Sequence, residues 1–190
     1  MNVRFAALIS VIIALVVILS TIAFIVPHFS QGYTGTLNTG DLGNLTAIPP
    51  GVSVSGNTIY INSSLTVSVE MGPMMQSVSM YSFMVYGQIN PELVIHSGLH
   101  INFMEVNVDN DSYHNFAITT APPPYPYMVM SSMMNGGHFM LNEPMLPPES
   151  GGIMHYSQQQ FTAGSPGTYW YICTYPGHAE SGMYGKILVA

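Results

Sequence analysis

The sequence predicts an all-β sandwich or barrel that follows one N-terminal transmembrane helix. Three features support this: an unbroken apolar stretch from Phe5 to Val26, short alternating strand patterns from residue 58 onward, and no long helical pattern after the apolar stretch. Short strands separated by turns are typical of sandwiches and barrels. We therefore expect a membrane anchor over residues 1–27, a flexible tether over 28–57 and an all-β domain over 58–190.

The apolar stretch over residues 5–26 is long enough to cross a membrane. At ~1.5 Å per residue it spans roughly 33 Å as a helix, against a hydrocarbon core of about 30 Å. A cleaved signal peptide is the alternative, but its apolar region is usually shorter and ends in small residues, whereas this stretch ends at Pro27. Arg4 is the nearby basic residue and should stay inside. We expect an uncleaved, single-pass anchor in the cytoplasmic membrane with the C-terminal domain outside the cytoplasm.

Residues 28–57 are rich in Gly, Thr, Asn and Ser and lack periodicity, which predicts a tether. Alternating or β-rich runs after it predict strands. They lie at 58–62, 65–70, 81–86, 92–95, 100–108, 115–118, 167–173 and 184–189. In the run at 167–173, alternation puts Trp170 and Ile172 on the face opposite Tyr169, Tyr171 and Cys173.

A segment rich in proline and methionine, residues 119–154, interrupts the strand pattern. A loop of this length is either functional or disordered. We expect an ordered insertion that covers one end of the sandwich. Its methionines could collect Cu(I), because thioethers are soft ligands, but packing is the commoner role of methionine.

The low charge of the chain excludes one class of function and suggests an environment. Charged residues make up 6% of the chain, and Lys and Arg total 2, so there is no basic surface for nucleic acid. Carboxylates are protonated in strong acid and cannot form salt bridges there. A fold that depends little on salt bridges therefore suits an acidophile; the alternative is a glycosylated exported protein with possible sequons at Asn44, Asn62 and Asn110.

The chemistry is concentrated in the segment from Cys173 to Met183, where Cys173, His178 and Met183 are each five residues apart. A thiolate, an imidazole and a weak axial thioether, with a second imidazole, form the ligand set of blue copper sites. The second imidazole must come from elsewhere. His114 is the best candidate, because it begins a strand that can lie beside this loop; His100, His138 and His155 compete with it.

This pattern resembles the cupredoxins, and within them the rusticyanin and sulfocyanin group. The resemblance is carried by C-x4-H-x4-M, by the preceding Gly-Thr-Tyr-Trp-Tyr-Ile-Cys173 and by the closing Met183-Tyr-Gly-Lys-Ile. The apolar N-terminus, the tether and the low charge are similar to the membrane-bound sulfocyanins of acidophilic archaea. The resemblance implies a Greek-key cupredoxin fold over 58–190.

The resemblance also implies roles for residues near the metal. His114, Cys173, His178 and Met183 would bind one type 1 copper ion. Asn115 would join the two ligand loops and offer its backbone N–H to the Cys173 sulfur, and the backbone N–H of Tyr175 could do the same. His178 would lie nearest to solvent, in a small apolar docking patch of Pro176, Gly177, Ala179 and Gly182.

The function implied is single-electron transfer in a respiratory chain, with copper cycling between Cu(II) and Cu(I) and with no small-molecule substrate. The expected partner is a respiratory redox protein such as a haem–copper terminal oxidase or a cytochrome. The alternative is an extracytoplasmic copper storage or delivery protein. An enzyme is disfavoured, because no acid partner or oxyanion motif accompanies Cys173 and His178, and the 7 histidines are too few for a multicopper enzyme.

Overall fold

The computed structural model of this chain describes residues 33–44, 46–73, 79–130 and 139–190, within a compact unit that spans residues 32–190. The predicted membrane anchor lies outside these residues. In the part of the chain that the structure describes, no helix has the length and apolarity needed to cross a membrane.

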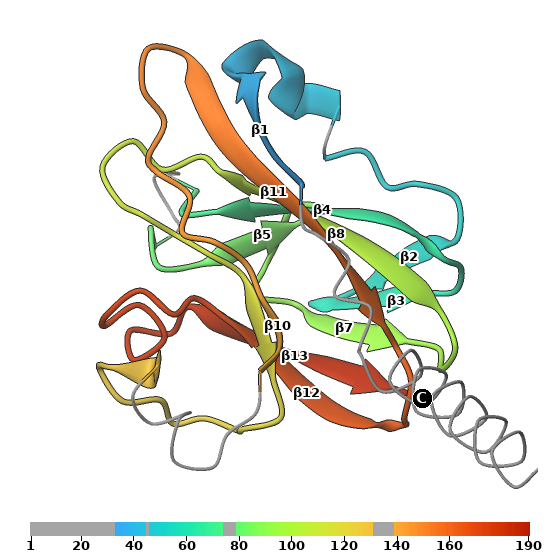
Figure 1. Cartoon of the computed structure of the whole chain (residues 1–190). Helices are drawn as coiled ribbons and strands as arrows, with labels where there is room; N and C mark the ends of the chain where they lie inside the picture. The colour runs from blue at the N-terminus through green and yellow to red at the C-terminus, as the bar shows by residue number, and fades with distance from the viewer. Residues whose placement is uncertain (1–32, 45, 74–78, 131–138) are drawn as a thin grey trace, which may run out of the picture. The chain divides into compact units, whose positions relative to one another are not determined.

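The described residues form two β-sheets and a short 3-10 helix. The first sheet has the order β1-β11-β8-β4-β5-β6, and the second has the order β10-β9-β12-β13-β7-β3-β2. Figure 1 shows β4, β5 and β8 of the first sheet above β7, β12 and β13 of the second. The elements are β1 (Tyr33–Asn38), η1 (Thr39–Asn44), β2 (Val52–Ser55), β3 (Thr58–Ile61), β4 (Leu65–Met71), β5 (Phe83–Val85), β6 (Gln88–Ile89), β7 (Glu92–Ile95), β8 (His100–Asn107), β9 (Ala117–Thr119), β10 (Phe139–Asn142), β11 (Ile153–Thr162), β12 (Gly167–Ile172) and β13 (Tyr184–Val189).

The core lies between the sheets and is built by strand alternation. On β8, Ile101 and Phe103 are fully buried while the intervening Asn102 is partly exposed. Phe116, directly before β9, stacks on Tyr171 of β12, with ring centroids 5.5 Å apart. Aromatic side chains therefore fill the sandwich next to the end where the candidate metal ligands lie.

The alternation predicted for β12 is confirmed. Tyr169, Tyr171 and Cys173 belong to the main core, whereas Ile172 and Trp170 belong to a second cluster on the other face of the sheet. This second cluster includes Tyr125 and Val129 from the segment rich in proline and methionine. The described part of that segment is thus packed on the sheet, as expected of an ordered insertion.

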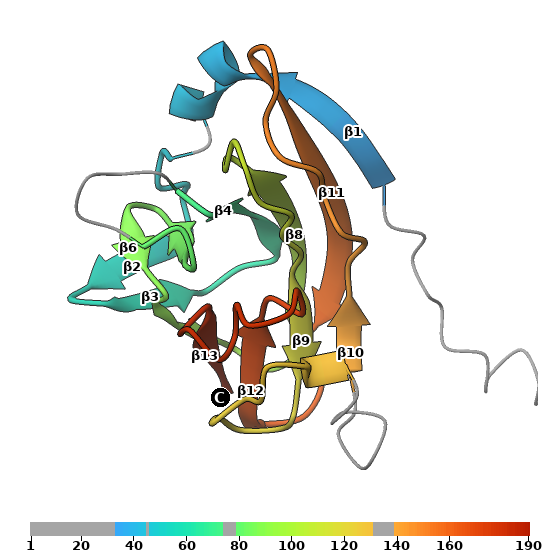
Figure 2. The ribbon, with the colours of Figure 1, turned by 90° about the vertical axis from the view of Figure 1, so that its left-hand side faces the viewer.

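The fold differs from the expectation at its N-terminal side. Residues predicted as a tether contain β1 and β2; β1 pairs along its length with β11, and β2 pairs with β3. Figure 2 shows β1 lying along β11 at the edge of the sheet. The sandwich therefore begins at Tyr33 rather than at residue 58, because pairing with a long neighbour lets a polar, glycine-containing run form a strand.

Three further strands were not foreseen. β6, β10 and β11 lie where the sequence predicted no strand, and β11, at Ile153–Thr162, is the longest strand described. Polar residues such as Gln158, Gln159 and Gln160 hide its pattern. Both sheets are mixed, since β4 runs parallel to β8, and β7 runs parallel to β3 and β13.

Candidate metal centre

The loop between β12 and β13 brings three of the predicted ligands together through its own backbone. The Cys173 N–H donates to the Met183 carbonyl at 3.2 Å, and the Met183 N–H donates to the His178 carbonyl at 2.9 Å. Gly177 and Gly182 have φ values of 82° and 104°, a region that favours glycine. The five-residue spacing thus corresponds to a tight loop in which the backbone of Met183 is hydrogen-bonded to those of Cys173 and His178.

His114 comes from a separate segment that precedes β9. Its backbone exchanges two hydrogen bonds with Leu146, at 3.3 and 2.8 Å, so the segment is held by the chain that follows β10. Its ring Nε2 lies 2.9 Å from Asp109 Oδ2, and both side chains are fully buried. This contact places the proton on Nε2 and leaves the Nδ1 lone pair free to bind a metal.

The three side chains converge on one point. His114 Nδ1 and His178 Nδ1 lie 3.9 and 3.5 Å from the Cys173 sulfur and 3.2 Å from each other. These three ligand atoms all lie within 4.8 Å of one another, close enough to bind a single metal ion. The thioether residue Met183 is fully buried in the same loop. Two imidazole nitrogens and one sulfur at this spacing suit a copper ion.

Burial keeps all three groups neutral when no metal is bound. Desolvation raises the pKa of Cys173 to about 11, although hydrogen bonds from the backbone of Asn115 and Tyr175 oppose this. Burial lowers the pKa of His114, opposed by Asp109. Burial, and then repulsion from His114, lower the pKa of His178 to about 4. The imidazoles are therefore ready for a metal, whereas the thiol must lose its proton when a metal binds.

The backbones of Asn115 and Tyr175 lie next to the Cys173 sulfur. The backbone of each hydrogen-bonds to the Cys173 sulfur. The Asn115 Oδ1 also accepts hydrogen bonds from the Thr174 N–H at 2.8 Å and the Thr174 hydroxyl at 3.1 Å. A single asparagine thus ties the His114 segment to the Cys173 loop.

The competing histidines lie elsewhere or outside the described residues. His100 is exposed and pairs with Thr162 at 3.1 Å. His155 lies on β11 and lines a surface hollow. His138 falls in a part of the chain that is not described. Among the described histidines, only His114 and His178 belong to the metal-type cluster.

Sequence reasoning missed the partners that orient the two rings. Asp109 lies five positions before His114, and this spacing could have suggested it. Ser112, whose Oγ lies 3.4 Å from His178 Nε2, gave no signal of its own. Gly72 closely approaches both Asp109 and His114, so a side chain there would strike them; only the fold reveals this.

The surface beside His178 is more aromatic than expected. A hollow of about 340 Å³ borders it and is lined by Tyr81, Ser112, Tyr127, Tyr175, Pro176, Gly177, His178, Glu180 and Ser181. The ring centroids of Tyr81 and Tyr175 lie 4.8 and 4.6 Å from that of His178. Of the predicted patch, Pro176 and Gly177 line the hollow, whereas Ala179 is buried.

Comparisons with known proteins agree with this geometry. A family model described as copper binding proteins of the plastocyanin/azurin family matches residues 76–190. Rusticyanin of Acidithiobacillus ferridurans is 34% identical over 137 residues, which cover 72% of this chain and 69% of the relative. A rusticyanin of Acidithiobacillus ferrooxidans is 32% identical over 136 residues, covering 71% and 83%. The 1.27 Å structure of rusticyanin from Thiobacillus ferrooxidans has a TM-score of 0.72 at 25% identity and covers 83% of this chain and 97% of that one.

Proposed function

Because this chain belongs to the plastocyanin/azurin family of copper binding proteins, we propose that it carries single electrons in a respiratory chain at the outer face of the cytoplasmic membrane. It is a blue copper cupredoxin related to rusticyanin, and members of this family transfer electrons rather than act as enzymes. In our proposal one type 1 copper ion is bound by His114, Cys173, His178 and Met183. The observation that supports this most directly is the convergence of the Cys173 sulfur and two Nδ1 atoms from two segments.

The protein's part in this function is to fix the ligands. Bound copper would supply the chemistry by alternating between Cu(II) and Cu(I). Cys173 provides the thiolate, and the N–H groups of Asn115 and Tyr175 stabilise negative charge on its sulfur. His114 and His178 provide neutral imidazoles, and Met183 provides a soft thioether. Buried ligands that are already oriented need little rearrangement when one electron arrives or leaves.

The path for the electron would run through His178. Of the two rings, His178 borders the surface hollow, and Tyr81 and Tyr175 flank it. A redox partner that docks over this hollow would come within contact of the ring. We propose a respiratory redox protein such as a haem–copper terminal oxidase or a cytochrome as that partner.

The membrane location rests on the sequence. The apolar stretch over residues 5–26 would anchor the chain by a single pass and leave the copper domain outside the cytoplasm. This arrangement, with the low charge of the chain, is the basis for proposing a sulfocyanin-like protein of an acidophile. Digestion of the copper domain by an added protease, in right-side-out and in inverted membrane vesicles, would test which side the domain faces.

The test of the function is a visible and EPR spectrum of the copper-loaded full-length chain, before and after ascorbate. We expect a strong thiolate-to-copper band and a narrow copper hyperfine splitting, bleached by ascorbate and restored by an oxidant. A pale protein whose copper exchanges readily with a chelator would contradict electron transfer and favour copper storage or delivery. The Cys173→Ser variant is the control, because it should remove the band without removing the imidazoles.

A further inference from the structure

Two buried carboxyl groups lie inside the sandwich, away from the metal cluster. Glu105 on β8 is fully buried, and Glu143, which follows β10, is 2% exposed. Glu105 Oε2 accepts a hydrogen bond from the Ser157 hydroxyl at 3.1 Å. Among the described residues, Glu105 Oε1 and both carboxyl oxygens of Glu143 have no hydrogen-bond partner. Such oxygens are costly to bury if they are ionised.

The surroundings favour the protonated form of both groups. Burial, and then the charge of Glu143, raise the pKa of Glu105 well above its ordinary value. Burial raises the pKa of Glu143 to about 7. The hydrogen bond from the Ser157 hydroxyl opposes the shift at Glu105 without cancelling it.

No cation compensates the pair in the described part of the chain. Lys186 forms its ion pair with Glu92, at 2.8 Å. In register with Glu105 are Val69 of β4 and Ser157 of β11, and neither is charged. The titratable groups on these neighbouring strands are Glu70, one position beyond Val69, and Tyr156 and His155, which pair with Val106 and Asn107 instead. Glu105 therefore faces uncharged side chains on both neighbouring strands, and the charge that acts on it is that of Glu143.

Glu143 is connected to the candidate metal centre by its backbone. Its N–H donates to the Phe116 carbonyl at 2.9 Å, and its carbonyl accepts a hydrogen bond from the Asn115 side chain at 3.0 Å. Asn115 is the residue that ties the His114 segment to the Cys173 loop. The position of Glu143 therefore sets the position of the asparagine that joins the two segments.

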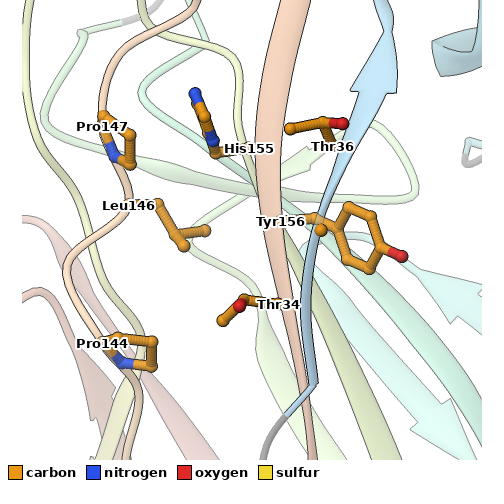
Figure 3. A pocket seen from close by; sticks show the side chains of 8 residues that line it. Thr34, Thr36, Pro144, Leu146, Pro147, His155 and Tyr156 are labelled. Atoms are coloured by element: carbon orange, nitrogen blue, oxygen red, sulfur yellow. The ribbon is translucent and has the colours of Figure 1, made fainter.

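The chain after Glu143 has little support on its outer side. A hollow of about 330 Å³ separates Pro144, Leu146 and Pro147 from β1 and β11. Figure 3 shows these three side chains on one side of the hollow, with Thr34 and Thr36 on the other. Hydrogen bonds on the inner side, between the backbones of Leu146 and His114 and from the Asn107 side chain to the Leu146 carbonyl, hold this segment, with the Glu143 carboxyl buried at its start.

We propose that the buried, uncompensated carboxyl groups of Glu105 and Glu143 are protonated positioning residues that keep residues 143–146, and through them Asn115, in place. Protonated, the two carboxyl groups lie between the sheets without a charged partner, and the Ser157 hydroxyl donates to Glu105 Oε2. When the pH rises, a proton leaves to solvent and an unpaired carboxylate remains between the sheets. Residues 143–146 then loosen, and Asn115 loses the carbonyl that holds its side chain. The link to the metal centre rests on the proposed copper site, whereas the protonated pair does not.

The sign of the expected pH effect follows from the raised pKa of Glu143. An acid with a raised folded pKa contributes stability that is fully present below its unfolded pKa, near 4.5, and is lost as the pH rises through about 7. We expect the Tm of the copper-loaded full-length protein to fall by about 5 to 10 °C between pH 5 and pH 8. The Glu105→Gln/Glu143→Gln double variant should keep its Tm over that range. The control variant Asp41→Asn, which removes an exposed charge on η1, should fall as the wild type does.

Two results would overturn the proposal: a Tm of the wild type that does not fall between pH 5 and 8, or a double variant that falls as much as the control. If the double variant does not fold, infrared spectroscopy of the wild type decides. A carbonyl band from a protonated carboxyl group should be present at pH 5.5, shift in deuterium oxide and disappear by pH 9; its absence at pH 5.5 contradicts the proposal.

A copper readout separates positioning from a purely structural role. In the wild type, the blue band and the reduction potential should change over the same pH range as the Tm, and they should not change in Glu143→Gln. A band that is independent of pH while the Tm falls would overturn the positioning role. If the protein shows the expected infrared band and Tm profile but never turns blue, the proposed function fails and the protonated pair stands.

Discussion

His114 and His178 present the same ring nitrogen to the Cys173 sulfur, but the regions that hold them are different. His114 is fully buried, and its Nε2 lies 2.9 Å from the buried carboxylate of Asp109. His178 lies in a loop beside a surface hollow, between two tyrosine rings, and its Nε2 lies 3.4 Å from Ser112. One ring is therefore fixed by a charge-assisted hydrogen bond, and the other is confined mainly by aromatic packing. The first region sets the geometry, and the second gives access to a partner.

The largest effect on stability should come from a side chain added at Gly72, beside the buried His114 and Asp109. Its φ is 69°, and a Cβ at this position would strike His114 Nε2 and Asp109. We expect Gly72→Ala to lower the free energy of unfolding by about 3 kcal/mol, from overpacking added to left-handed strain. The matched control is Gly87→Ala, with φ of 77° and no atom within 4 Å of the new Cβ, which should cost about 1 kcal/mol. Chemical unfolding measures both; equal losses would show that the Asp109–His114 contact is not crowded.

The second effect concerns the carboxylate itself. Hydrogen bonds from His114 and from the Asp111 backbone hold the pKa of Asp109 below its ordinary value despite its burial. Asp109→Asn keeps the size of the side chain but removes the charge and one acceptor oxygen. We expect the affinity for copper to fall by about 10- to 100-fold, the usual cost of losing a partner that orients a ligand histidine. A competition titration against a chelator measures this, and an unchanged affinity would show that His114 does not depend on Asp109.

The same contrast explains what the sequence could and could not predict. The spacing of Cys173, His178 and Met183 is local, so the sequence was sufficient to predict how these residues share one loop. His114 was predicted from its place at the start of a strand, and the structure brings it to the loop. Asp109, Ser112 and Gly72 act on the rings across turns and strands, and their contacts depend on tertiary packing that no local pattern encodes.

Strand prediction succeeded and failed for a related reason. β4, β8, β12 and β13 alternate clearly, because each has one face in the core. β1 is an edge strand, and β11 lies between it and β8, with polar residues at many positions. On β11 the buried Met154 and Phe161 are separated by mostly polar residues, and β1 is held by its pairing with β11, so neither strand shows a clear apolar alternation in the sequence.

The third effect appears when copper is removed and the pH is lowered. Burial, and then His114, lower the pKa of His178 from 6.5 to about 4. A base with a lowered folded pKa contributes stability that is present above its unfolded pKa, near 6.5, and is lost as the pH falls through about 4. Allowing for the water-facing edge of the ring, we expect the metal-free protein to lose on the order of 2 kcal/mol over that range.

Bound copper should protect against this loss, because it competes with the proton for the ring nitrogen. Thermal unfolding with and without copper, from pH 7 to pH 3.5, measures the difference. A His178→Asn variant has no ring to protonate, so its metal-free form should lose less stability over the same range. A metal-free wild type as stable at pH 3.5 as at pH 7 would contradict the assignment.

The smallest effect should come from Ser112, the polar partner of the His178 ring. Its Oγ lies 3.4 Å from His178 Nε2, near the outer limit for a hydrogen bond, and both atoms border the hollow, where water can replace the hydroxyl. We expect Ser112→Ala to change the affinity for copper by about twofold or less, roughly 0.4 kcal/mol. The chelator competition used for Asp109→Asn measures it under the same conditions. If Ser112→Ala weakens binding as much as Asp109→Asn, then His178 is fixed by a hydrogen bond after all, and the two histidines are held in the same way. If the ratio between the two variants is about tenfold, the region of His114 orients its ligand by a hydrogen bond and the loop of His178 relies on packing, with the His178 ring beside the hollow where a redox partner would dock.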